Sequence, residues 1–224
     1  NDGAAAAAGA LALGLSILSI ENYKEQLELS ATEWLLNERS DLTNFRLQTL
    51  DFDGKKVKDM SSTSVITFKV EEFDPNRMPK FLTTESNLGG RKWVLMAFTS
   101  YGWMNENGVD FSRVKWFLID RMKWLSMMTT YVKAASGITD EELIMSRISA
   151  GRIVNKGVRE RTSSSLTIPF YKLGNDMYIV AEYDEDLKFI YNENSLGIYL
   201  KKTKDLVQMS RNVLVDINGF FFDY

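Results

Sequence analysis

Two residue types that carry much of protein chemistry, cysteine and histidine, are missing from this sequence. Without cysteine, the chain can form neither a disulfide framework nor a thiolate metal site. Without histidine, it lacks the commonest general base and the commonest metal ligand. Carboxylate, lysine and tyrosine chemistry is still open, but we find no spacing typical of a catalytic, metal or nucleotide motif. We therefore predict that the protein is not an enzyme and uses no cofactor and no metal.

The sequence also has no overall excess of positive charge. Its 27 basic and 30 acidic residues give a formal net charge of −3 and a pI near 5.2. A protein of this charge has no general attraction for nucleic acid, so a polyanion-binding site would need a local basic patch. The length of 224 residues is enough for one large domain or two small ones.

One short stretch, Gly151–Ser165, supplies such a patch. It contains four basic residues and a single acidic residue, Glu160. One interpretation is a solvated linker, and the other is a loop that binds phosphate or the carboxylates of a partner. The predicted polyanion-binding residues are Arg152, Lys156, Arg159, Arg161, Lys115 and Lys123.

The longest run of helical periodicity is Val109–Gly137, for which we predict a single helix of about seven turns. Asp110 or Ser112 can cap its start, and Gly137 is well placed just past its end. Its other face is rich in lysine and arginine. That face is either the solvated side of a core helix or a cationic surface for lipid head groups or phosphate. The apolar stripe expected to face the core is Val114, Phe117, Leu118, Met122, Leu125, Met128, Val132 and Ala135.

The first twenty residues, Asn1–Ile20, are almost entirely apolar, and none from Ala4 onward is charged. The run falls slightly short of the roughly 20 apolar residues that span a bilayer. Three interpretations remain: an arm that packs on protein, a membrane-inserting helix, or the remnant of a targeting segment. We favour the arm, because alanine is a weak driver of membrane insertion. The residues expected to mediate self-association or membrane contact are Leu11, Leu13, Leu15, Ile17, Leu18, Ile20, Phe220, Phe221 and Phe222.

A polar helix is predicted over Glu21–Asn37, with Leu27, Ala31, Trp34 and Leu35 facing inward. A second short helix is predicted after a capping box at Thr139–Glu142, running from about Asp140 to Ile148, and a third over Lys204–Ser210. Alternation and turn signals predict strands over Asn44–Phe52, Ser64–Phe73, Arg91–Tyr101, Leu166–Tyr171, Asp176–Tyr183, Leu187–Tyr191, Leu196–Lys201 and Asn212–Phe222.

These elements predict an α+β fold, in which a mostly antiparallel sheet packs against the long central helix and the second helix. We divide the chain into an apolar arm and helix over residues 1–37 and a single domain over residues 38–224. A cluster of carboxylates at Glu182–Asp186 could serve acid–base chemistry or hold a hard cation, but a solvated turn is the more ordinary interpretation.

The layout of an Ala/Gly/Leu-rich start followed by strands and an aromatic-rich sheet resembles that of the actinoporin-like pore formers. The resemblance covers the N-terminal segment and Met177–Tyr199. It implies a protein that inserts its N-terminal helix into membrane. The aromatic cluster and Pro-rich loops that bind lipid in that family are not evident here, and the central helix has no counterpart, so we assign no family.

Two functional hypotheses follow. The first is a non-enzymatic structural subunit of coat, matrix or filament type that assembles with copies of itself through the apolar arm. It would contact nucleic acid through the basic stretch. The alternative is a membrane-active protein. The sequence gives no localisation.

Overall fold

The computed structural model describes residues 17–50, 64–74, 89–100, 102–105, 108–151, 153–154, 157–158, 179–191 and 195–223. These residues form two four-stranded antiparallel sheets with helices, so the predicted α+β class is confirmed. The chain divides into two compact units, Asn1–Ile119 and Asp120–Tyr224. This division differs from the predicted one, and the strands lie in two sheets rather than one.

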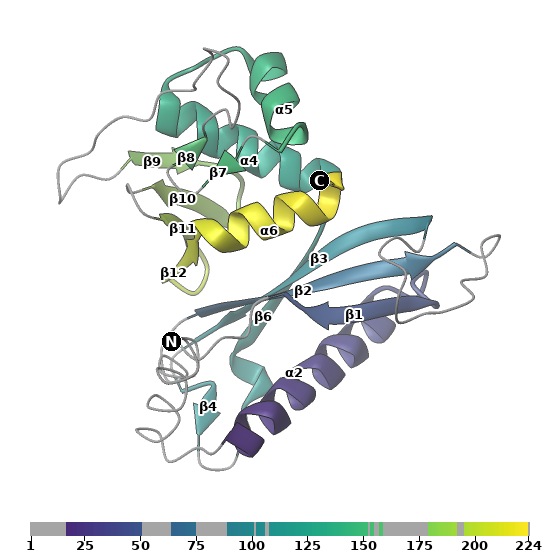
Figure 1. The fold of residues 1–224 in the computed structure, drawn as a ribbon. Helices are drawn as coiled ribbons and strands as arrows, with labels where there is room; N and C mark the ends of the chain where they lie inside the picture. Colours follow the sequence, from purple (N-terminus) through teal and green to yellow (C-terminus); the bar gives the residue numbers. More distant parts are fainter. Residues whose placement is uncertain are drawn as a thin grey trace. The chain divides into compact units, whose positions relative to one another are not determined.

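The first unit is built on a sheet with strand order β1-β2-β3-β6 (Figure 1). Strand β2 has the predicted bounds, and Val94–Thr99 of β3 is buried without interruption, as expected for an interior strand. The strands of the sheet are β1 (Phe45–Thr49), β2 (Ser64–Phe73), β3 (Gly89–Thr99) and β6 (Val114–Asp120). The segment between β3 and β6 contains β4 (Met104–Asn105), β5 (Gly108–Val109) and a 3-10 turn (Phe111–Arg113).

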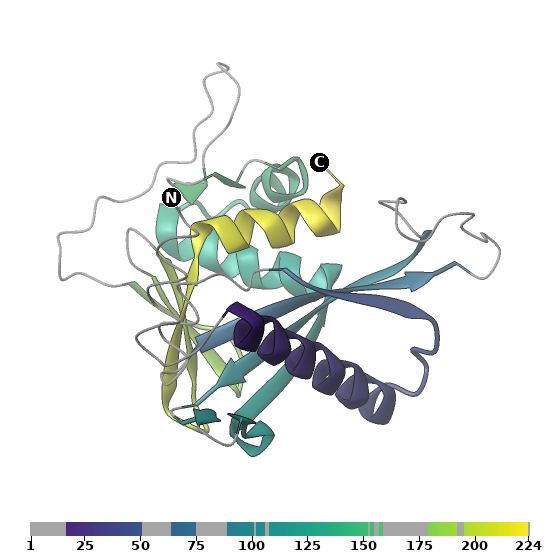
Figure 2. The same cartoon turned by 60° about the horizontal axis from the view of Figure 1, so that its bottom comes forward.

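Helix α2 (Ile17–Glu38) lies along this sheet (Figure 2). Leu27, Ala31 and Leu35 recur at four-residue spacing and are buried in one hydrophobic cluster with residues of β2 and β3. Trp34 is half-buried against the same cluster and stacks on Trp116 of β6, with ring centroids 6.1 Å apart. The predicted inward face of this helix is therefore confirmed.

The second unit combines three helices with a sheet of strand order β12-β11-β10-β9 (Figure 1). Its helices are α4 (Arg121–Ser136), α5 (Glu141–Ser149) and α6 (Arg211–Phe222). Its strands are β9 (Ile179–Glu182), β10 (Leu187–Tyr191), β11 (Ser195–Leu200) and β12 (Asp205–Ser210), beside a small hairpin of β7 (Ile153–Val154) and β8 (Gly157–Val158). Helix α4 packs against β9, β10 and α5.

Glycine is required at one interior position of this sheet. Gly197 of β11 lies opposite Ile190 of β10 in the antiparallel register. A Cβ atom added at Gly197 would come within 2.6 Å of the Ile190 carbonyl oxygen. Any larger residue would therefore push the two central strands apart.

The polar side chain of Asn218, fully buried on α6, joins the three helices of the second unit. Its Nδ2 donates to the Ile148 carbonyl oxygen at the end of α5 (2.8 Å), and its Oδ1 accepts from Trp124 Nε1 of α4 (3.0 Å). Both partners are themselves buried. The bond to Asn218 therefore satisfies the indole N–H of Trp124, which is buried away from water.

The predicted long helix over Val109–Gly137 is wrong in its first half. Residues Val114–Asp120 form strand β6, and the helix begins only at Arg121. Asp120 marks the change, because its carboxylate accepts a hydrogen bond from the Lys123 backbone N–H (2.7 Å) and caps α4. The predicted end is confirmed: Gly137 follows the helix with φ of 72°.

The apolar stripe predicted for that helix is correct only in part. Leu125, Met128 and Val132 are buried on α4, whereas Met122 is 59% exposed. The indole of Trp124, which is not part of the predicted stripe, is completely buried. The predicted helix over Asp140–Ile148 is confirmed as α5, but its cap is Asp140, whose side chain accepts from Leu143 N, rather than Thr139.

Helix and strand are exchanged at the end of the chain. The predicted short helix over Lys204–Ser210 is strand β12, and the predicted strand over Asn212–Phe222 is helix α6. The strands predicted over Leu187–Tyr191 and Leu196–Lys201 are confirmed as β10 and β11. The predicted strand over Leu166–Tyr171 lies outside the described residues.

Candidate functional site: the outward face of helix α2

Helix α2 exposes two leucines on the side opposite the sheet. Leu29 is 70% exposed and Leu36 is 53% exposed, while Leu27, two residues before Leu29, is 1% exposed. A helix advances about 100° per residue, so Leu29 points about 200° away from both Leu27 and Ala31. Asn22, Leu29 and Leu36 are spaced by seven residues, or about two turns, and form one row along this outer face.

The row is flanked by carboxylates. Glu21, Glu25 and Glu33 are exposed and lie within about 80° of the leucine row at the same advance per residue. No lysine or arginine is present on this side, since Lys24 projects toward the sheet side of the helix. Within the described part of the chain, none of the three glutamates makes an ion pair. The outward face of α2, as we call the surface of Glu21, Asn22, Glu25, Leu29, Glu33 and Leu36, is thus apolar in the middle and acidic at its edges.

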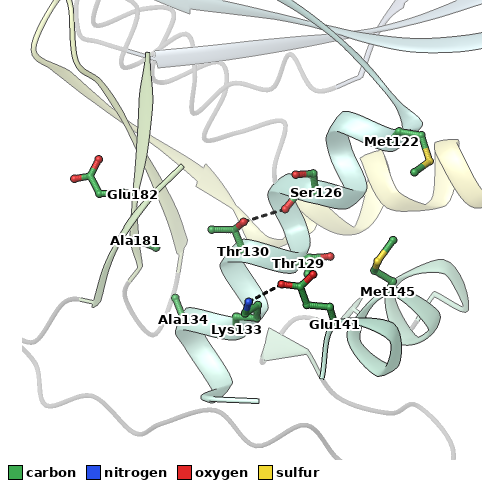
Figure 3. A pocket seen from close by; sticks show the side chains of 10 residues that line it. All are labelled: Met122, Ser126, Thr129, Thr130, Lys133, Ala134, Glu141, Met145, Ala181 and Glu182. Atoms are coloured by element: carbon green, nitrogen blue, oxygen red, sulfur yellow. Dashed lines mark hydrogen bonds and ion pairs between the residues drawn. The ribbon is translucent and has the colours of Figure 1, made fainter. Parts of the chain in front are cut away.

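A pocket of about 590 Å³ lies in the second unit, along one side of α4 (Figure 3). Its lining includes Met122 of α4 and Met145 of α5, and Lys133 of α4 forms an ion pair with Glu141 of α5 (Nζ–Oε1 2.6 Å). The remaining lining is small or polar: Ser126, Thr129, Thr130, Ala134, Ala181 and Glu182.

The polar groups that line this pocket form hydrogen bonds or ion pairs within the protein. Thr129 and Thr130 donate their hydroxyl hydrogens to carbonyl oxygens one turn earlier on α4, at 2.7 and 3.1 Å. The carboxylate of Glu182 points away from α4 (Figure 3) and pairs with Lys201 (2.6 Å). The pocket therefore presents neither an activated nucleophile nor an uncompensated charge among its lining residues.

The predicted acidic turn over Glu182–Asp186 is neutralised by lysines. Asp184 Oδ2 lies 3.1 Å from Lys123 Nζ, and Asp186 lies 2.7 Å from Lys202. Partial burial favours the neutral form of Asp184, but backbone N–H donors, chiefly that of Leu187, and the ammonium of Lys123 outweigh it, so the pKa of Asp184 is lowered. Within the described residues, no group of three or more acidic side chains is arranged to hold a metal ion.

A second ionic cluster lies at the end of α2 in the first unit. Arg39 forms a two-bond ion pair with Asp41 (2.9 Å each), and Arg91 forms one with Glu72 (2.6 and 3.0 Å). Both guanidinium groups stack on Trp93, at 4.4 and 5.3 Å from the ring centroid. The hydrogen bonds from Arg39 hold the pKa of the Asp41 carboxyl far below its ordinary value. Since the charges balance in pairs, this cluster fastens the chain after α2 to β3 rather than leaving a cation for a ligand.

The two predicted polyanion-binding lysines that the structure describes belong to different units. Lys115 is exposed on strand β6 of the first unit, whereas Lys123 is on α4 of the second unit and is paired with Asp184. The other four residues, Arg152, Lys156, Arg159 and Arg161, lie outside the described residues. The predicted polyanion site therefore stays a prediction.

The predicted self-association residues are also placed only in part. Ile17, Leu18 and Ile20 belong to α2, but their side chains, together with Leu11, Leu13 and Leu15, lie outside what the structure describes. At the other end, Phe221 is buried in the second unit and packs against Trp124, while Phe220 and Phe222 are half-buried. Phe221 therefore serves the core of its own unit.

Sequence reasoning missed Leu29 and Leu36. Their spacing in the sequence was the signal that could have identified them. Leu29 and Leu36 are seven residues apart, and each lies on the side of the helix opposite the buried Leu27 and Leu35. Comparison with protein families, curated proteins and solved structures gives no match for this chain. No helix within the described ranges is long and apolar enough to cross a membrane.

Proposed function

We propose that this chain is a non-enzymatic structural subunit, of coat, matrix or filament type, that assembles with copies of itself through its N-terminal region. The observation that carries the proposal is the exposed leucine row on the outward face of α2. The sequence ahead of it, Ala4–Ile20, adds an uncharged apolar segment. Single exposed leucines are ordinary, but Leu29 and Leu36 lie in one row opposite the packed face of the helix, and this arrangement supports a surface for another protein.

The energetic reason is straightforward. The fold of the first unit uses Leu27, Ala31 and Leu35, so Leu29 and Leu36 contribute nothing to its core. Removing a leucine side chain from water stabilises an assembly by about 1.5–3 kcal/mol. Part of that gain offsets the freedom lost on association, so assembly should depend on concentration.

The test is a Leu29→Gln/Leu36→Gln double variant, compared with the wild type by sedimentation velocity over a range of concentrations. We expect the wild type to form larger species and the double variant to shift toward the single chain. A matched control is Met122→Gln/Leu206→Gln, because both of those side chains are also exposed but belong to the second unit. The control should sediment like the wild type.

Two outcomes would overturn the proposal. One is a wild type that stays a single chain at every concentration. The other is a wild type that floats with lipid vesicles while remaining a single chain without them, which would favour the membrane-active alternative. Circular dichroism of each variant separates lost association from lost folding.

A further inference from the structure

The pocket along α4 extends over most of the length of that helix (Figure 3). Its lining side chains on α4 begin with Met122 in the first turn and end with Lys133 and Ala134 in the last. Met122 and Lys133 are eleven residues apart, which corresponds to about 16 Å along a helix. The volume of about 590 Å³ is within the range of sites that hold small molecules. The pocket therefore suits an elongated ligand with different chemistry at its two ends.

The wall between these ends can be covered by an aliphatic chain at little cost. The hydroxyl hydrogens of Thr129 and Thr130 are donated to carbonyl oxygens of α4, so a chain that covers them leaves neither donor unpaired. Ala134 and Ala181 add only methyl groups. Met122, which is 59% exposed, has a flexible and polarisable thioether that adapts to an apolar ligand. These side chains favour an unbranched hydrocarbon chain as the body of the ligand.

The charged end of the pocket favours an anionic head group. The side chain of Glu141 is 60% exposed and that of its partner Lys133 is 39% exposed. Ion pairs this exposed contribute little, so a second anion can exchange for Glu141 on the ammonium of Lys133. Once displaced, the Glu141 carboxylate would still lie in the first turn of α5, where the helix dipole favours a negative charge. An ammonium ligand would instead have to displace Lys133, the more buried partner.

We propose that the pocket along α4 binds an amphipathic anion, an alkyl carboxylate whose head group replaces Glu141 on Lys133 and whose chain runs toward Met122. Glu182, the other carboxylate of the lining, does not oppose such a ligand. It points away from α4 (Figure 3) and is paired with Lys201 at 2.6 Å. The inference goes beyond the proposed function and does not depend on association between copies.

The first test titrates the protein with decanoate, kept below the concentration at which it forms micelles, and follows isotope-labelled methionine methyl groups by NMR. We expect the signals of Met122 and Met145 to shift and to saturate together. The signal of Met209, buried in β12, should stay in place. Octanoate has two methylenes fewer and should bind about tenfold more weakly, because less apolar surface leaves water.

The second test separates the two charges of the pocket. Lys133→Gln should weaken decanoate binding about five- to tenfold, because the carboxylate head loses a charged hydrogen-bond donor. Glu141→Gln should strengthen it by about two- to fivefold, because the competing carboxylate is gone. Lys202→Gln makes the same change in net charge as Lys133→Gln on a lysine that is 82% exposed and outside the pocket, and it should bind like the wild type. Circular dichroism confirms that each variant is folded.

Three outcomes would overturn the inference. Decanoate that shifts neither Met122 nor Met145 shows that the pocket does not take such a ligand. Shifts that spread over all methionines without saturating show general adsorption. Decylammonium that binds more tightly than decanoate, with Glu141→Gln weakening it, shows that the head group is a cation. These results are measured on the single chain, so they are independent of whether the proposed assembly forms.

Discussion

Helices α2 and α4 differ in the interactions made by the side chains that face away from the core. On α4, polar side chains are matched by the rest of the second unit: Lys123 by Asp184, Ser126 by the Tyr183 hydroxyl, and Lys133 by Glu141. On α2, the outward face carries exposed leucines, together with glutamates that form no ion pair with any described residue. The polar side chains of α4 are paired within its own unit, whereas the outward face of α2 leaves Leu29 and Leu36 exposed.

This difference shows where to look for function in a chain without catalytic signals. Side chains that are matched within a unit explain stability. Exposed apolar side chains such as Leu29 and Leu36 have no such role in their own unit, so they are the positions at which the proposed assembly can be tested. Four predictions, ordered from the largest expected effect to the smallest, test the contrast between the two helices.

The largest effects should come from the buried faces of both helices. Leu125→Ala on α4 and Leu27→Ala on α2 should each lower the free energy of unfolding by about 2–5 kcal/mol, because a cavity replaces a buried side chain. Met122→Ala, on the exposed side of α4, should change it by less than about 0.5 kcal/mol. Denaturant titration measures all three. Equal effects for Leu125→Ala and Met122→Ala would show that the assigned face of α4 is wrong.

Asn218→Ala should cost about 1–3 kcal/mol of unfolding free energy, because Trp124 Nε1–H and the Ile148 carbonyl would lose a buried partner. Asn37→Ala, an exposed amide near the end of α2, is the control and should have almost no effect. The emission of Trp124 should also change in the folded Asn218→Ala variant. A folded variant with wild-type stability would mean that water replaces the amide without loss.

Acid should weaken the contact between α4 and the β9–β10 turn. The pKa of Asp184 is lowered from its ordinary 3.8, so its contribution is present above about pH 4 and is lost as the pH falls through the lower folded value. Asp184→Asn should reduce stability at neutral pH by up to about 1 kcal/mol, since the pair is partly exposed. The difference from the wild type should shrink below pH 4 in denaturant titrations. A difference that does not shrink as the pH falls below 4 would contradict this account.

The smallest effect on folding should come from Leu29→Ala, only two positions from Leu27. Its side chain is exposed, so the free energy of unfolding of the single chain should change by less than about 0.5 kcal/mol. Association should nevertheless weaken. Measuring both properties on Leu27→Ala and Leu29→Ala compares two leucines of one helix that differ only in the direction they face. A large loss of stability in Leu29→Ala at low concentration would place that leucine in the core.

The sequence predicted secondary structure best where a single hydrophobic period, that of a strand or that of a helix, dominates a segment. The bounds of strand β2 and the buried residues of α2 were predicted correctly. The run Val114–Asp120 misled because its spacing also fits a helix, and no glycine or proline separates it from α4. Its residue types, with Val114, Trp116 and Ile119 among them, favour strand, and Asp120 is a capping residue in the middle of the predicted helix.

The exchange of β12 and α6 has a similar cause. Strand β12 alternates between exposed Leu206 and Gln208 and buried Val207 and Met209, a pattern too short to outweigh its helix-compatible residues. Helix α6 is rich in valine, isoleucine and phenylalanine, which favour strands, yet tertiary burial of its apolar face decides for helix. The candidate site could have been predicted, because once Leu27, Ala31 and Leu35 are assigned to the buried face, an advance of about 100° per residue places Leu29 and Leu36 on the opposite face.

The bond between Trp124 and Asn218 has a consequence for how the second unit folds. It joins residues 94 positions apart, so it closes a loop that contains most of that unit. Contacts of such long range form late, because the chain loses much of its freedom before they can stabilise it. The sheet of this unit pairs consecutive strands, which close short loops, so its hairpins should form before this contact. The last step of folding should be the docking of α6, which until then leaves the indole of Trp124 in water.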